Sequence, residues 1–184
     1  MRTPIYLYHV PRTGGTALNK ALQKHPLVKL VSDGHERWHK RKGLTVAFLR
    51  DPAAHMVSMY DYIRHRNHAE RDHAQKCGSF AAWAKAQGSS IGNFIKFFSQ
   101  SVTLDEAIEN LQRVSFVGFT DRLQNDFNLA LKTFGINCVI TVPRANETPD
   151  PQKTKLTAKD IKLAHKLRSE DYKLYQWALK HRGR

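Results

Sequence analysis

Cysteine is scarce in this chain. Only Cys77 and Cys138 occur among 184 residues, and they are far apart in the sequence. No C-x-x-C or Cys/His spacing of a zinc site is present, so the sequence argues against a metal site. Disulfides are rare in reducing compartments. We therefore expect two free thiols.

Long apolar runs are also absent. No segment approaches the roughly 20 apolar residues of a membrane-spanning helix. The first residues, Met1 to Pro4, lead directly into a strand-like stretch, without the apolar region of a signal peptide. We expect a protein that has no membrane span and works in the cytoplasm.

Acidic residues are few. The chain has 16 Asp and Glu against 30 Lys and Arg, a net charge of +14 with its ten histidines neutral. Such a chain attracts polyanions, which include nucleic acid, anionic membrane, acidic polysaccharide and phosphorylated cofactors. Its apolar and charged fractions are ordinary for a globular protein. Its length suits one domain over residues 1–184.

Short apolar runs alternate with helical patterns along the chain. Proline and glycine mark several boundaries, and Thr103 and Thr157 are typical helix caps. Residues 64–78 are polar, and we expect a helix end and a loop there. The alternation predicts an α/β, single-domain, P-loop-like fold with a mostly parallel central sheet flanked by helices. The predicted strands are residues 5–10, 27–31, 44–49, 114–118 and 138–142.

The clearest motif is Pro11-Arg12-Thr13-Gly14-Gly15-Thr16, between the first strand and the first helix. A helix N-terminus offers unpaired N–H groups and partial positive charge, and glycine lets the backbone curl around an anion. Arg12 adds a cation, and the two threonines add hydroxyls. No Gly-Lys-Ser/Thr follows, so the motif is not a Walker A loop, which argues against a magnesium-dependent ATPase.

A second segment comes from the predicted strand at residues 44–49. Arg50 follows this strand directly, and Ser58 lies in the next helix. Ligands of open α/β sheets bind at the carboxyl ends of strands, where the planar fork of an arginine can pair with a phosphate. Taken alone, Arg50 is equally explained by a surface ion pair.

Residues 9–18 resemble the 5′-phosphosulfate loop of sulfotransferases that use 3′-phosphoadenosine-5′-phosphosulfate (PAPS). The loop is similar to that of the heparan sulfate O-sulfotransferase group, which mostly has lysine at the position of Arg12. At that position the loop is more similar to that of tyrosylprotein sulfotransferases, which have arginine. Residues 46–52 with Ser58 resemble the family's 3′-phosphate segment. The resemblance implies that PAPS and its product PAP are bound by Pro11, Arg12, Thr13, Gly14, Gly15, Thr16, Ala17, Arg50 and Ser58.

The resemblance also implies sulfuryl transfer to an acceptor hydroxyl. Arg12 would stabilise charge on the transferring group, since an arginine stays protonated. The predicted loop at residues 32–43 offers His35, Glu36 and His39 as a general base, and we favour His35 because histidine titrates near neutral pH. The acceptor could be an anionic glycan, a protein tyrosine, a lipid or a small alcohol.

Two other functions fit parts of the sequence. A nucleic-acid-binding module would explain the net charge, but no motif for specific recognition is present. A P-loop-type kinase for a small metabolite would explain the first turn, but the Gly-Lys-Ser/Thr that it needs is missing.

Overall fold

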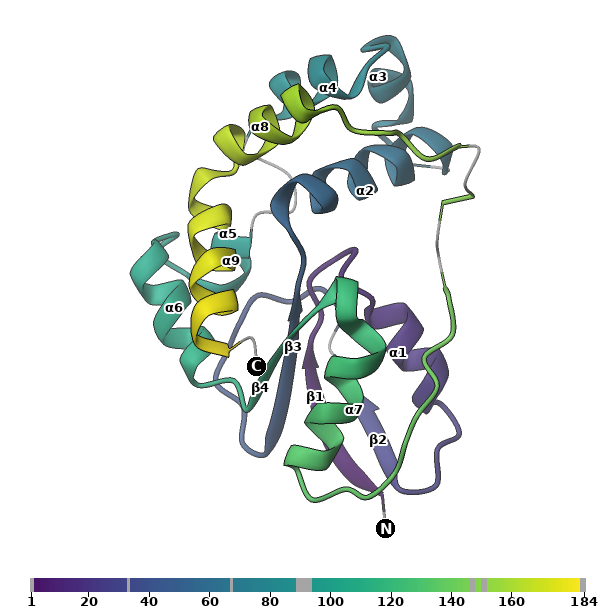
Figure 1. The fold of residues 1–184 in the computed structure, drawn as a ribbon, viewed down its shortest axis with the longest axis vertical. Helices are drawn as coiled ribbons and strands as arrows, with labels where there is room; N and C mark the ends of the chain where they lie inside the picture. Colours follow the sequence, from purple (N-terminus) through teal and green to yellow (C-terminus); the bar gives the residue numbers. More distant parts are fainter. Residues whose placement is uncertain are drawn as a thin grey trace.

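The computed structural model describes residues 2–32, 34–66, 68–88, 94–145, 148–149 and 152–182. Within these ranges the centre is a four-stranded, all-parallel sheet flanked by helices (Figure 1). The strand order is β2-β1-β3-β4. The α/β class and the parallel sheet predicted from the sequence are confirmed. The strands are β1 (Thr3–Tyr8), β2 (Val28–Val31), β3 (Leu44–Leu49) and β4 (Phe116–Phe119).

Both faces of the sheet are buried, as the nearly continuous apolar strands require. In β3, Val46 and Phe48 belong to one apolar cluster, whereas Ala47 and Leu49 belong to another on the opposite face. Successive strand residues point to opposite faces, so one short strand serves two cores. The helices α1 (Gly15–Leu22) and α7 (Leu123–Thr133) cover the first face, and α5 (Phe94–Phe98), α6 (Leu104–Gln112) and α9 (Ser169–Arg182) cover the second.

A third apolar cluster lies beyond the carboxyl ends of the strands, at the top of Figure 1. It is built around the aromatic side chains of Tyr60, Phe80 and Trp83, whose rings contact one another. The cluster holds the next helix after β3 against the carboxyl edge of the sheet. Its helices are α2 (Pro52–His65), α3 (Arg71–Lys76), α4 (Phe80–Gln87) and α8 (Ala158–Leu167).

The predicted strand at residues 138–142 is wrong. Its alternation of apolar residues is real, because Ile140 is buried while Val139 is 85% exposed. Among the residues that the structure describes, the segment nevertheless pairs with no strand. Its backbone is held by side chains of α7, since Ile140 N–H donates to Asn128 Oδ1 at 2.9 Å and Val142 N–H donates to Gln124 Oε1 at 2.7 Å. The side-chain amides of a helix take the place of a neighbouring strand.

The expected loop at residues 64–78 is also partly wrong, because it contains the short helix α3. Ala74 of this helix is fully buried in the third cluster, and tertiary packing therefore stabilises a segment of weak helical pattern. Cys77 and Cys138 are both free thiols. No helix among the described residues is long and apolar enough to cross a membrane.

Candidate functional site

The turn between β1 and α1 leaves a helix N-terminus open. The N-cap residue, Gly14, has a φ of 92° and no side chain with which to cap the helix. Within the described parts of the chain, the amide N–H groups of Gly15 and Thr16 donate to no acceptor. These groups and the helix dipole together favour an anion at this end of α1.

Glycine is needed at both positions of the Gly14-Gly15 pair. The left-handed backbone of Gly14 is strained for any residue with a Cβ atom. A Cβ atom on Gly15 would lie 2.2 Å from the ring of His9. The His9 ring therefore packs directly against the first residue of α1, which only a glycine allows.

Arg12 is held in an unusual conformation above this turn. Its φ of 64° is in the left-handed region, which is uncommon for a long side chain and is often associated with function. Its Nε donates to Ser58 Oγ of α2 at 3.1 Å. The guanidinium carbon lies 4.8 Å from the centre of the Tyr62 ring, in a cation–π contact.

Arg50 reaches the same turn from the end of β3. Its Nη1 donates to the backbone oxygen of Arg12 at 3.2 Å. Because β1 and β3 are parallel neighbours in the sheet, their carboxyl ends meet at one edge. Three residues predicted from separate segments, Arg12, Arg50 and Ser58, are therefore joined by two hydrogen bonds.

Other predicted residues of the turn have structural roles. The Thr13 hydroxyl was expected to be a donor for an anion, but it donates to the backbone oxygen of Val10 at 2.8 Å and is buried. The N–H of Ala17 donates to Gly14 O at 3.0 Å. Pro11 has no N–H, and its oxygen accepts a hydrogen bond from His55 at 2.9 Å. These three contacts shape the turn.

Two histidines beside the turn, His55 and His9, have lowered pKa values. Complete burial lowers the pKa of His55 to about 3, although its hydrogen bond to Pro11 opposes the shift. Burial, with a smaller effect of His35, lowers the pKa of His9 to about 4. A carbonyl oxygen only accepts, so Nε2 of His55 carries the proton. The local positive charge comes from arginines, three of which, Arg168, Arg50 and Arg12, are close enough to disfavour a charge on His55.

His35, the favoured general base, contacts His9, and the His9 ring in turn packs against Gly15 of the turn. The two ring centres are 4.6 Å apart, and His35 Nδ1 is 3.0 Å from the backbone oxygen of His9. Nδ1 must donate this bond, so in the neutral ring Nε2 carries the lone pair. Glu36 is exposed, and the His39 ring contacts the backbone oxygen of Arg37 at 3.3 Å.

Three residues of this site were not predicted from the sequence. Tyr62 lies one helical turn after Ser58, so the spacing in α2 could have indicated it. His55 lies three residues before Ser58 and could have been indicated by the same spacing, whereas Thr120 gave no such signal. Thr120, in a 3₁₀ turn (Thr120–Arg122), donates to the backbone oxygens of Leu49 at 3.0 Å and Thr13 at 3.4 Å. It thereby connects the end of β3 to the turn.

No protein-family model matches this chain, and no curated protein matches it. Functional inference therefore depends on the geometry of this site.

Proposed function

We propose that this chain is a nucleotide-binding α/β protein with a P-loop-like turn between β1 and α1. Within that class, we propose a sulfotransferase that uses PAPS and modifies an acceptor hydroxyl. The observation that carries the proposal is the pair of hydrogen bonds that joins Arg12 to Ser58 and Arg50 to the Arg12 backbone. It brings together two candidate anion sites at the carboxyl edge of the sheet, where such folds bind ligands.

The residues at this edge suit a nucleotide with two separate anionic groups. The open N-terminus of α1, with Gly14 and Gly15, would hold the 5′-phosphosulfate through backbone N–H groups. Arg50 and Ser58 would hold the 3′-phosphate. When bound, PAPS supplies an activated sulfuryl group. An ordinary nucleotide without a 3′-phosphate would not use Arg50 and Ser58, which distinguishes PAPS from ATP.

Arg12 would act through its charge. Burial lowers the pKa of Arg12, while Tyr62 and Asp61 partly offset this effect. A guanidinium stays protonated in proteins and cannot give up its proton as an acid. Fixed in place by Ser58 and Tyr62, it would stabilise negative charge that develops near the turn, without reorganising during the reaction.

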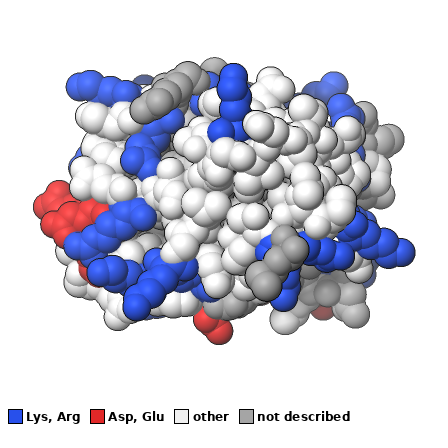
Figure 2. Space-filling model, turned by 90° about the horizontal axis from the view of Figure 1, so that it is seen from below, with Lys and Arg blue, Asp and Glu red and all other residues white. Residues whose placement is uncertain are grey.

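His35 would take the proton from the acceptor hydroxyl at Nε2. Its Nδ1 is used by the His9 backbone oxygen, which orients the ring and leaves the other nitrogen to accept. Of the acceptors named above, we propose an anionic glycan. The net charge of +14 supports an acidic partner. Lys and Arg also outnumber acidic side chains on the face shown in Figure 2, which lies at the amino ends of the strands.

Thermal unfolding in the presence of nucleotides tests the proposal. A ligand at about 100 times its Kd should stabilise the protein by roughly 2.7 kcal/mol. We expect PAP to raise Tm, and AMP or ATP with magnesium to have little effect. The shift with PAP should be lost in Arg50→Ala and kept in Arg113→Ala, a matched change at an exposed arginine after α6.

A shift with ATP and magnesium alone would favour the kinase instead. If Arg50→Ala and Arg113→Ala responded equally to PAP, the assignment of Arg50 to the 3′-phosphate would be wrong. Where PAP does bind, transfer of labelled sulfate from PAPS to a panel of glycans, tyrosine peptides and small alcohols would identify the acceptor.

A further inference from the structure

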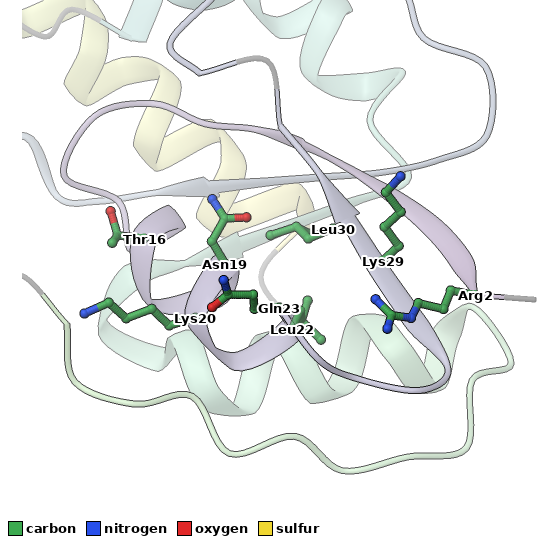
Figure 3. Close-up of a pocket in the computed structure, with 8 residues that line it drawn as sticks. All are labelled: Arg2, Thr16, Asn19, Lys20, Leu22, Gln23, Lys29 and Leu30. Atoms are coloured by element: carbon green, nitrogen blue, oxygen red, sulfur yellow. The ribbon is translucent and has the colours of Figure 1, made fainter.

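A groove of about 450 Å³ lies between α1 and β2, beside the start of β1 (Figure 3). This volume is within the roughly 300–1,000 Å³ typical of sites for small molecules. Three of its lining residues are cations, Arg2, Lys20 and Lys29. The groove shares only Thr16 with the turn described above, so it is a separate feature of the molecule.

The parallel sheet brings these cations together. Thr3 pairs with Val28 and Pro4 pairs with Lys29, so Arg2 and Lys29 come from adjacent strand starts. Lys20 comes from the exposed side of α1. In Figure 3, Lys20 lies at one end of the groove, and Arg2 and Lys29 lie at the other. The positive charge is thus divided between the two ends.

The wall between the cations is suited to an organic molecule. Leu30 provides a half-buried apolar surface and Leu22 is only 2% exposed, while Asn19, Gln23 and Thr16 provide amide and hydroxyl groups. Among the residues that the structure describes, no Asp or Glu lines the groove. An anion would therefore meet attraction at both ends without repulsion from a carboxylate.

We propose that this groove binds a small organic bisphosphate. Its carbon skeleton would lie on Leu30, one phosphate would reach Lys20, and the other would reach Arg2 and Lys29. A single-stranded nucleic acid would instead need a long cationic groove with stacking aromatic rings, and no aromatic residue among the described ones lines this groove. The inference does not depend on sulfotransferase activity.

Titration followed by ¹H–¹⁵N NMR tests this proposal, with glucose 1,6-bisphosphate as the probe. We expect saturable shifts at the amides of residues 19–23 and 29–30. The double variant K20Q/K29Q should bind roughly 9-fold to 25-fold more weakly, since each exposed ion pair is worth roughly a threefold to fivefold change in affinity. The variant K24Q/K132Q loses the same charge outside the groove and should change affinity less than twofold. Arg50→Ala should bind normally.

Four outcomes would overturn the proposal. Shifts confined to residues 11–16 and lost in Arg50→Ala would place the probe on the turn. Equal weakening in both lysine double variants would mean general charge attraction. Inorganic pyrophosphate binding the groove as tightly as the sugar bisphosphate would remove the role of the apolar wall. Absence of a saturable shift up to about 10 mM probe would mean that no site exists. Because PAP is not part of this experiment, the result is independent of the proposed function.

Discussion

Two strands that are neighbours in the sheet, β1 and β3, lead into helices with different N-termini. At the start of α1, Gly14 has no side chain to cap the helix. At the start of α2, Asp51 Oδ1 accepts from the N–H groups of Ala53 and Ala54 at 2.9 and 3.0 Å. Pro52 occupies the first helical position, where no N–H is needed.

This difference is consistent with the proposal that one sheet edge binds two parts of a ligand. No side chain caps the N-terminus of α1, whereas that of α2 already has a carboxylate. Asp51 is held further by His165, whose Nε2 lies 2.9 Å from Asp51 Oδ2. The β3–α2 junction therefore contributes side chains, Arg50 and Ser58, and its backbone N–H groups are used internally.

The largest effect on ligand affinity should come from removing Arg12, the cation of the β1–α1 turn. Arg12→Ala loses the guanidinium and its bond to Ser58 while the Gly14-Gly15 backbone remains. We expect PAP affinity to fall roughly hundredfold, because removing a partly buried charged partner costs about 2–5 kcal/mol. Calorimetric titration measures this directly. A change of less than about threefold would mean that the backbone N–H groups bind the anion without Arg12.

His55 of α2 donates a hydrogen bond to Pro11 and so connects the β3–α2 junction to the β1–α1 junction. The effect of this histidine should be visible in the pH dependence of stability. The native pKa of His55 is about 3, mainly because of burial, against an ordinary value of 6.5. Between these values the unfolded chain binds a proton that the native protein does not. His55 therefore favours folding above pH 6.5, and this contribution is lost as pH falls towards 3.

We expect His55→Gln to make this dependence shallower by about 1.4 kcal/mol per pH unit between pH 6 and 4. Urea unfolding at several pH values gives the slope, which is the relevant quantity because the substitution also changes stability at neutral pH. His9→Gln, at the second histidine of lowered pKa, should reduce the slope between about pH 6 and 5 in the same direction. An unchanged slope in His55→Gln would mean that His55 is protonated in the native protein.

Removing the internal cap should have a smaller effect on stability. Asp51→Ala leaves the first N–H groups of α2 without their acceptor and breaks the pair with His165, so we expect a loss of about 1–2 kcal/mol in the free energy of unfolding. Asp51→Asn keeps a capping oxygen and should lose less. Chemical denaturation measures both. Equal losses would show that the His165 pair, rather than the cap, is the stabilising contact.

The smallest effect concerns the backbone at Arg12. Arg12→Gly and Arg12→Ala both remove the guanidinium, but only glycine adopts a φ of 64° without strain. We expect the glycine variant to be more stable than the alanine variant by about 1 kcal/mol. Denaturation of the two variants in parallel measures this difference. Equal stability, or a more stable alanine variant, would mean that the turn relaxes when the arginine is removed.

Much of the fold could be predicted because its signals are local. The apolar run at residues 44–49 corresponds to β3, and the proline that follows it, Pro52, begins α2. The segment at residues 138–142 had an equally good strand pattern. It failed as a strand because side chains of α7, 12 to 18 residues earlier in the sequence, bind its backbone. A periodic pattern reports burial, and it does not report which element supplies the hydrogen bonds.

The sequence by itself determined the parallel α/β class, the glycine turn at residues 14–15 and the presence of Arg12 within this turn. Each follows from interactions between residues a few positions apart. Only the tertiary structure decided that Arg12 meets Ser58, 46 residues away, and that Arg50 meets the Arg12 backbone, 38 residues away. The same is true of the His55–Pro11 bond and of the groove between α1 and β2. These contacts depend on the order of strands in the sheet and on the packing of α2 over its edge, which no local pattern encodes.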